Sequence, residues 1–243
     1  MTPTSTLTST SLSTAARDIG IALLALAALL AWDASPGDLV MARWFGTRYG
    51  FGLRDNWFLV SVMHQGARVV AWVVMAVLLI AIVRPVGLLR RLERRARVQL
   101  ALTGIAALLA VSAIKHASHV SCPWDVQDFG GIAPYVSHWA WSVRDTGPGG
   151  CFPAGHASAA FACFGGYFVF RQTSPGVARA WLAAVVLSGL ALGLAQQIRG
   201  AHFTSHTLWT AWVCWVVALI IDCAFAAARH SRSCSTSTLP FSP

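Results

Sequence analysis

A series of six apolar segments separated by short polar ones constrains the fold of this chain more than any other feature. The segments cover residues 19–32, 68–83, 100–114, 156–170, 180–196 and 207–228. Apolar residues make up 56% of the chain and charged residues only 11%, which leaves too little polar surface to cover a soluble domain. Several segments are shorter than the ~20 residues that cross a hydrocarbon core, so their ends must extend into neighbouring residues. The sequence predicts an all-α, polytopic membrane bundle with six transmembrane helices.

The two ends of the chain differ from this central part. Residues 1–16 are rich in Ser and Thr and lack hydrophobic periodicity, which favours a disordered N-terminal tail. We expect one membrane domain at residues 17–230 and a C-terminal tail at residues 231–243. The first apolar segment follows Arg17 as a signal peptide would, but Trp32 and Asp33 come next without a small-x-small cleavage site. We therefore treat it as a membrane helix.

Charge bias between the loops sets the orientation. If the N-terminus lies inside, the inner segments hold 11 of the 18 basic residues, including six arginines between residues 84 and 97. Short loops rich in Lys and Arg stay in the cytoplasm, so both termini are expected to be cytoplasmic. The net charge of +9 does not indicate a nucleic-acid partner, because the basic residues form no stripe interleaved with aromatics. Lipid headgroups explain them better.

Three polar islands, at residues 115–125, 151–156 and 199–206, then lie together on the outer face. They hold the only lysine, five of the eight histidines and one arginine. In a bacterium this face is the periplasm, where disulfides persist. Cys122 and Cys151 are the two cysteines placed there, and we predict a disulfide between them. Two separate thiols are the alternative, since sequence alone does not fix the pairing.

The islands combine the groups that covalent phosphate chemistry requires: a nucleophile, an acid and cations. His156 follows Pro153-Ala154-Gly155 and begins an apolar segment, where free backbone N–H groups and the helix dipole favour an anion. His202 precedes the last segment, and His206 follows one helical turn later. Such a pair fits a metal site, a catalytic couple or two interfacial residues. Lys115 ends the third segment, and its position beside the histidines favours phosphate over simple snorkelling.

In order along the chain, these residues resemble the three signature motifs of the type 2 phosphatidic acid phosphatase superfamily. The matching stretches are Lys115-x6-Cys122-Pro123, Pro153-Ala154-Gly155-His156 and the segment from Gly200 to His206. The resemblance covers residues 100–218, and three ordered motifs are far more specific than one. It implies that Lys115 and Gly155 bind phosphate, that His156 is the general acid, and that His202 is the nucleophile that becomes phosphohistidine. It implies no metal and no cofactor.

The chain departs from the family pattern at four positions. That pattern reads Lys-x6-Arg-Pro, Pro-Ser-Gly-His and Ser-Arg-x5-His-x3-Asp, with an arginine in each outer motif. Here Cys122 and Gln196 stand in place of the arginines, Ala154 in place of the serine and His206 in place of the aspartate. Without these groups a site binds a dianionic phosphate less strongly unless other residues compensate.

Nearby residues are candidates to compensate. Arg199 lies three residues after Gln196 and three before His202, nearly on one helical face, so we expect its guanidinium to bind phosphate, with Gln196 as support. His206 is expected to accept the hydrogen bond from His202, and Asp125 or Asp128 is the alternative negative charge. The substitutions together are similar to a divergent bacterial branch of membrane-associated phosphatases. An inactive relative is disfavoured, because both histidines and the lysine remain.

The resemblance implies an enzyme of the bacterial inner membrane that hydrolyses a lipid phosphate or lipid diphosphate at the periplasmic face. Phosphatidic acid, phosphatidylglycerophosphate, undecaprenyl diphosphate and the phosphates of lipid A are the implied substrates, and the sequence chooses neither among them nor an oligomeric state. Phosphotransfer between lipids and a non-catalytic lipid-binding protein are alternatives. A haem or metal protein using His116, His119, His202 and His206 is another, although haem ligation needs histidines that face each other within a bundle.

Overall fold

The computed structural model describes residues 4–140 and 142–236. Within these residues, five helices are long and apolar enough to cross a membrane. They belong to α1 (Thr4–Asp33), to η1 (Phe58–Gly66) with α3 (Ala67–Ala81), to α4 (Arg94–Ala117), to α7 (Pro175–Ile198) and to α8 (Thr204–Thr236). The chain is therefore a multi-pass helical membrane protein, which confirms the expected fold class.

The sixth expected span, residues 156–170, is a short and interrupted helix. It consists of α5 (Ser158–Phe161), the 3-10 turn η5 (Ala162–Phe164) and α6 (Gly165–Phe170). At helical rise, Ser158–Phe170 is only ~20 Å long, against ~30 Å for a hydrocarbon core. Four of its phenylalanines are almost fully buried, and it packs against α4, α7 and α8. Longer helices therefore enclose this segment, which explains how a short helix is tolerated at membrane depth.

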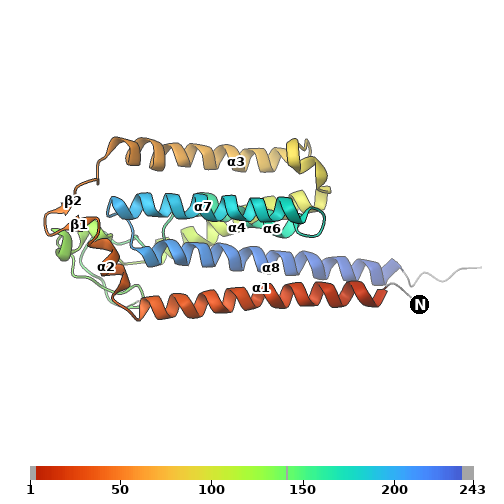
Figure 1. Ribbon diagram of the computed structural model, residues 1–243, viewed down its shortest axis with the longest axis horizontal. Coiled ribbons are helices and arrows are strands. Elements are labelled where there is room, and N and C mark those ends of the chain that lie inside the picture. Colours follow the sequence, from red (N-terminus) through yellow and green to blue (C-terminus); the bar gives the residue numbers. More distant parts are fainter. Residues whose placement is uncertain (1–3, 141, 237–243) are drawn as a thin grey trace, which may run out of the picture.

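The long helices differ in how deeply they are buried (Figure 1). α4 is the most buried span, and it packs against α3, α6 and α8. The η1–α3 span is the least buried and lies at one edge of the bundle, with α1 beside α8 on the other side. Large apolar side chains such as Leu24, Val69 and Leu187 are more than 60% exposed. A surface of this kind suits lipid tails rather than water.

The two ends of the bundle carry different structures (Figure 1). Both termini and the arginine-rich turn η2 (Gly87–Arg91) lie at one end. The opposite end carries α2 (Gly37–Ala42) and a small hairpin of β1 (Gly46–Thr47) and β2 (Gly50–Phe51), in which Gly46 pairs with Phe51. The 3-10 turns η3 (Pro123–Asp125) and η4 (Gln127–Phe129) pack near this hairpin. All three polar islands lie next to helix ends on the hairpin side of the bundle.

Helix boundaries depart from expectation at two places. The second span begins at Phe58, ten residues before the expected start at residue 68, because a π-helix continues directly into α3. α1 begins at Thr4 and so extends into the stretch expected to be a tail, while residues 1–3 and 237–243 lie outside the described residues. The division into two tails and one membrane domain stays a prediction.

Candidate active site

Backbone hydrogen bonds join the three polar islands at the hairpin end of the bundle. The Trp124 N–H donates to the Gly200 carbonyl at 2.9 Å, which links the first island to the third. The Ala154 N–H donates to the His206 carbonyl at 3.1 Å, which links the second to the third. Gly200 has φ +77°, a conformation that glycine adopts without strain, and it forms the turn between α7 and α8. The motifs that are far apart in sequence therefore meet in one site.

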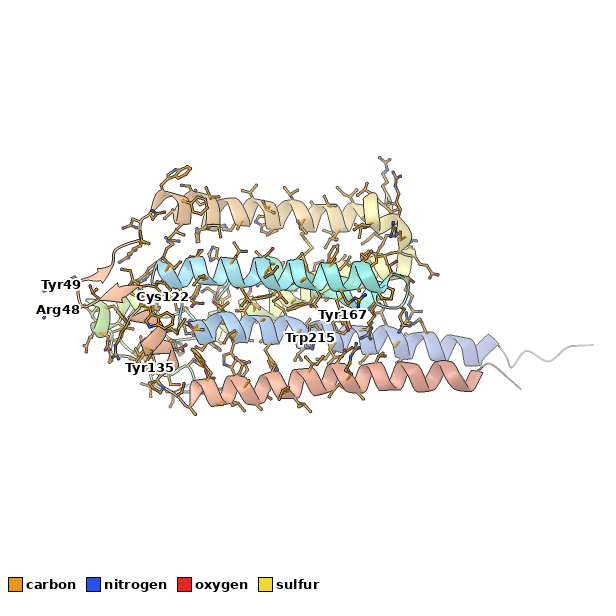
Figure 2. The ribbon with its side chains drawn as sticks, viewed as in Figure 1. Arg48, Tyr49, Cys122, Tyr135, Tyr167 and Trp215 are labelled. Carbon is orange, nitrogen blue, oxygen red and sulfur yellow. A yellow bond between two sulfur atoms is a disulfide. The ribbon has the colours of Figure 1, made fainter. Side chains whose placement is uncertain are left out.

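A disulfide between Cys122 and Cys151 adds a covalent link between the first two islands. The two Cα atoms lie 5.2 Å apart, a usual separation for a disulfide. Cys122 lies at the same end of the molecule as Arg48 and Tyr49 of the hairpin, whereas Tyr167 and Trp215 lie farther along the bundle (Figure 2). The structure thus holds the cysteines as a pair rather than as separate thiols.

His202 lies between α7 and α8 and is 6% exposed. Its Nδ1 is 3.8 Å from the Cys151 sulfur. Burial lowers the pKa of His202 well below its usual value, and the positive charges of Lys115 and His156 lower it further. The imidazole is therefore neutral at physiological pH, which is the form that can attack phosphorus.

His156 lies in a turn two residues before α5, and its Nε2 is buried without a hydrogen-bond partner among the described residues. α5 has only four residues but continues through η5 into α6, and the phosphate cradle expected at its start stays a prediction. Burial lowers the pKa of His156 to about 3, and the neighbouring His64, Lys115, Arg68 and Arg199 lower it further. The site therefore gathers positive charge around an unpartnered imidazole.

Lys115 lies in the last turn of α4, directly beside the second island. Its Cδ is 3.7 Å from the position that a Cβ on Gly155 would occupy. The Lys115 charge acts on both His156 and His202. Lys115, His156 and His202, the three residues carried over from the family motifs, thus lie close enough to interact electrostatically.

Arg199 is 8% exposed, and its guanidinium is held by two hydrogen bonds. Its Nε donates to the Arg54 carbonyl at 2.8 Å, and one terminal nitrogen donates to Gln196 Oε1 at 3.1 Å. The Gln196 side-chain nitrogen is buried and has no partner within the described residues. Gln196 therefore orients Arg199, and the Arg199 charge reaches His156.

His206 is 1% exposed and lies in the first turn of α8. Its ring centroid is 5.8 Å from that of His202, in an edge-to-face arrangement. The Nδ1 of His206 is buried and unpartnered in the described part of the chain, so the expected hydrogen bond between the two rings is not formed here. The role of His206 in orienting His202 stays a prediction.

The acidic residues near the site occupy other positions than expected. Asp125 lies in η3, and the described residues give its carboxylate no contact with either histidine. Asp128 pairs with Arg43 at 2.9 Å. Asp38 of α2, which is buried, instead accepts the Ser205 N–H at 2.8 Å and also bonds the Ser205 hydroxyl. This carboxylate caps the start of α8 and so fixes the segment between His202 and His206.

A second carboxylate, that of Asp33, is connected to the His206 ring by a chain of aromatic contacts. Asp33 at the end of α1 lies 3.1 Å from His138 Nε2 and accepts the Trp209 indole N–H at 2.8 Å. The His138 ring stacks on Phe152 with centroids 4.3 Å apart, and Phe152 lies 5.3 Å from His206. This cluster packs the second island against α8.

Cys151, His202 and His206 place potential metal-ligand atoms within 4.8 Å of one another. The Cys151 sulfur is in the disulfide and so is not a thiolate, and a thiolate is the form that binds zinc. Two imidazoles then remain, fewer than the three protein ligands of a catalytic zinc site. The group fits a metal poorly as it stands.

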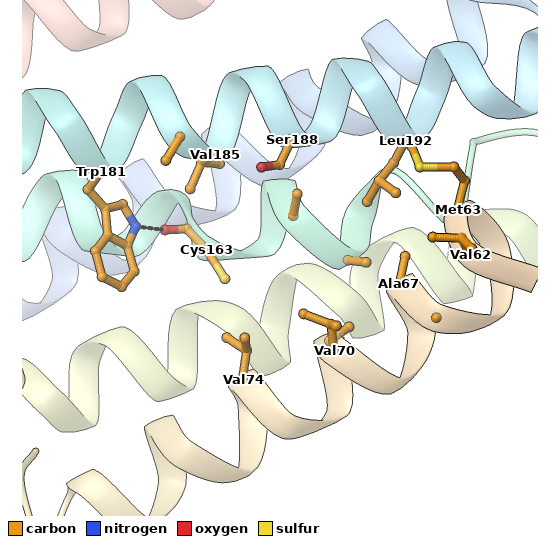
Figure 3. Close-up of a pocket in the computed structure, with 15 residues that line it drawn as sticks. Val62, Met63, Ala67, Val70, Val74, Cys163, Trp181, Val185, Ser188 and Leu192 are labelled. Carbon is orange, nitrogen blue, oxygen red and sulfur yellow. Dashed lines mark hydrogen bonds between the residues drawn. The ribbon is translucent and has the colours of Figure 1, made fainter. Parts of the chain in front are cut away.

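Two cavities lie on either side of α3 near His156. One, of about 310 Å³, is lined by His156 and Arg68 at one end and by Trp72, Met75 and Leu108 elsewhere. The other, of about 600 Å³, lies between α3, the short enclosed helix and α7 and is almost entirely apolar (Figure 3). Ala67, Ala71 and Ala159 contribute to both. The cationic site is therefore next to apolar space at the edge of the bundle.

Comparison with known protein families shows which family the chain belongs to. The model of the PAP2 superfamily matches residues 96–229, which include all three islands. The chain belongs to the PAP2 superfamily. No curated protein and no solved structure matches it. PAP2 members are typically metal-independent phosphatases that act on phosphate esters such as lipid phosphates, so the resemblance of the three motifs is confirmed.

His64 and Arg68 are the site residues that sequence reasoning missed. Both lie in the η1–α3 span, outside the part of the chain that matches the PAP2 superfamily. The His64 ring contacts that of His156 with centroids 3.8 Å apart. The one available signal was a polar triplet, His64-Gln65-Gly66, within an apolar stretch.

Proposed function

We propose that this PAP2 protein is a membrane phosphatase that removes phosphate from a lipid phosphate or lipid diphosphate. The observation that carries the proposal is the 310 Å³ cavity, in which His156 and Arg68 meet the apolar side chains of α3 and α4. A phosphate needs the cationic end, and a lipid chain needs the apolar one. The cavity suits a substrate with both parts.

The reaction proceeds in two steps. A ring nitrogen of His202 attacks phosphorus, the P–O bond to the lipid breaks, and His156 gives its proton to the departing oxygen. His156 then removes a proton from water, whose oxygen attacks phosphorus as the P–N bond breaks and orthophosphate leaves. Lys115 and Arg199 stabilise the charge that develops on the phosphoryl oxygens.

Substrate binding favours the protonated form of His156, which is the form that can act as an acid. In the empty site its pKa is about 3, so the imidazole is neutral at physiological pH and cannot act as an acid. A bound phosphate brings negative charge among the surrounding cations, which favours the protonated imidazole and raises its pKa. The acid is therefore present only when there is phosphate to cleave.

The proposed location is the bacterial inner membrane, with six membrane segments, both termini in the cytoplasm and the site in the periplasm. The inner excess of arginine supports this orientation, as does the position of the arginine-rich turn η2 at the end that carries both termini. A disulfide between Cys122 and Cys151 suits the oxidising periplasm.

Phosphate release from a panel of lipid phosphates tests the proposal. The panel contains phosphatidic acid, phosphatidylglycerophosphate, a polyprenyl diphosphate and lipid A, each presented in mixed micelles to wild type, His156→Ala and His202→Ala. We expect activity on at least one lipid and a loss on the order of 10⁴- to 10⁶-fold in His202→Ala, since a covalent nucleophile is removed. Arg48→Ala, in the exposed hairpin, is the matched surface control. Equal phosphate release by wild type and His202→Ala on every lipid contradicts the proposal.

A further inference from the structure

The contact between His64 and His156 has no function in the scheme above. The ring centroids are 3.8 Å apart and the planes are tilted by 32°. His64 Nδ1 and His156 Nε2 are both buried, and neither has a hydrogen-bond partner among the described residues. Leaving two such nitrogens unpaired costs free energy, so a shared polar ligand between or beside the rings would relieve both.

The local structure of the second span places His64 at this position. His64 lies in the π-helix η1 (Phe58–Gly66), which packs against α7 and continues into α3. π-helical turns are rare and occur frequently at functional sites. Gln65, the next residue, is exposed, so the same turn directs His64 toward His156 and Gln65 outward.

Arg68 lies four residues after His64 and lines the same cavity as His156. Its positive charge acts on His64 and on His156. Residues four apart on a helix lie on one face, so η1–α3 presents an imidazole and a guanidinium in the same direction. A guanidinium binds phosphate through paired charge-assisted hydrogen bonds, and a neutral imidazole can donate one hydrogen bond to it.

The family motifs explain why such groups are needed here. Two family arginines are replaced by Cys122 and Gln196 in this chain. Cys122 is in the disulfide and Gln196 bonds Arg199, so neither supplies a cation. Within the described residues, the additional cationic side chains that reach His156 come from η1–α3 and from Arg199.

We propose that His64 is a phosphate-binding residue of this site, and that Arg68 supplies a guanidinium in place of a missing family arginine. This inference rests on the proposed phosphatase function and extends the site into a span that lies outside the PAP2 match. The phosphoryl group sits beside the two rings, with Lys115, Arg199 and His202 around its other oxygens. The lipid portion extends along Trp72, Met75 and Leu108.

Two variants of His64 separate ligand binding from packing. His64→Phe keeps an aromatic ring but has no nitrogen, and His64→Ala removes the ring as well. Gln65→Ala, on the same π-helix but facing outward, is the matched control. For the second residue, Arg68→Lys keeps the charge and Arg68→Ala removes it. Each variant is purified as the full chain and measured for phosphate release and for thermal stabilisation by orthovanadate.

We expect His64→Phe to lower kcat/KM on the order of 10- to 100-fold, with a raised KM. Its stabilisation by vanadate should be lost, and Arg68→Lys should retain more activity than Arg68→Ala. The cationic side chains Lys115, Arg68 and Arg199 still face His156 in His64→Phe, so the pH profile should change little. A purely structural His64 would leave KM and vanadate binding of His64→Phe unchanged.

The outcomes separate this inference from the proposed function. If His202→Ala abolishes phosphate release while His64→Phe matches wild type in kcat/KM and vanadate stabilisation, the inference is wrong and the phosphatase stands. If wild type releases no phosphate from any lipid, the proposed function is wrong. Vanadate then still decides the role of His64, because loss of stabilisation in His64→Phe supports an anion site, whereas unchanged stabilisation, or none in wild type, overturns it.

Discussion

The two ends of the bundle both bury polar side chains, but more of them lack partners at the hairpin end, while the described residues at the terminal end leave Arg97 Nε unpartnered. Toward the termini, Arg171 bonds Asp18 and also lies 2.6 Å from an Asp222 oxygen, while Gln99 donates to the other Asp222 oxygen at 2.8 Å. At the hairpin end, the described residues leave buried nitrogens of four side chains unpartnered: His64, His156, Gln196 and His206. Paired charges hold helices together, whereas each buried polar group without a partner needs a separate explanation, such as a ligand.

The contrast also extends to charge balance. In the terminal cluster the Arg171 guanidinium faces two carboxylates, which balance it. Around His156 the neighbouring charges are Lys115, Arg68 and Arg199, all positive. Clusters of one sign raise the local concentration of the opposite ion. The unbalanced positive charge at the hairpin end therefore favours a bound anion, whereas the balanced charges at the terminal end favour stability.

Removing a carboxylate from the terminal cluster should have the largest effect on stability. Asp18→Asn breaks a largely buried ion pair that joins α1 to the segment after α6, and breaking a buried pair costs about 3–5 kcal/mol. Thermal unfolding in detergent should show the loss, while kcat of the remaining folded protein stays near wild type. A large fall in kcat at unchanged stability would break the division between the two ends.

The disulfide tests how far the site depends on its covalent link. Cys122→Ser with Cys151→Ser opens a loop with a sequence separation of 29, for which about 3 kcal/mol of stabilisation is typical. Because Cys151 contacts His202, we expect activity to fall together with stability. Denaturation with and without reductant measures stability, and phosphate release measures activity. Full activity after reduction would show that the link does not position the nucleophile.

Lys115 should affect activity more than stability, since it ends α4 beside the pocket and only its ammonium group is needed there. Lys115→Ala removes one cation from the phosphoryl oxygens, and losses on the order of 100-fold in kcat/KM accompany the removal of one such group. Lys115→Arg should restore part of the activity. Steady-state kinetics on the best lipid of the panel, with Arg48→Ala as control, measures both. Unchanged kcat/KM in Lys115→Ala would place the phosphate elsewhere.

The smallest expected effect is on the pH dependence of stability. The pKa values of His156 and His202 are depressed in the folded protein, so the unfolded chain binds more protons below its histidine pKa of about 6.5. Stability should therefore decrease as pH falls from about 6.5 toward 3, on the order of 1 kcal/mol per pH unit for each histidine. His156→Gln should reduce this slope in thermal unfolding at graded pH. A slope that stays equal to wild type would contradict the depressed pKa.

The sequence predicted the parts of the site that are continuous along the chain. The order of Lys115, His156 and His202 at the ends of apolar segments predicted three islands on one face, and the contacts between islands agree with this. The membrane-bundle class followed from composition alone. Local patterns of this kind are readable because hydrophobic length and motif spacing depend on neighbouring residues only.

The contacts that sequence did not predict arise from packing between distant segments. His64 reaches His156 because η1 packs against α7 while α3, into which it continues, packs against α5, and Asp38 reaches Ser205 across 167 positions. Neither contact has a periodic signal. The short helix at Ser158–Phe170 was also expected to be a full span, since hydropathy does not distinguish a segment that faces lipid from one that other helices enclose.

Trapping the phosphorylated enzyme tests the central claim most directly. Brief incubation with a lipid substrate labelled on its phosphorus, followed by denaturation at alkaline pH, should leave an acid-labile label on the peptide that contains His202. The label should be absent from His202→Ala and should form more slowly in His156→Gln, because the departing oxygen is no longer protonated. Label on another residue, or turnover by wild type with no labelled His202 at any time, would contradict the account.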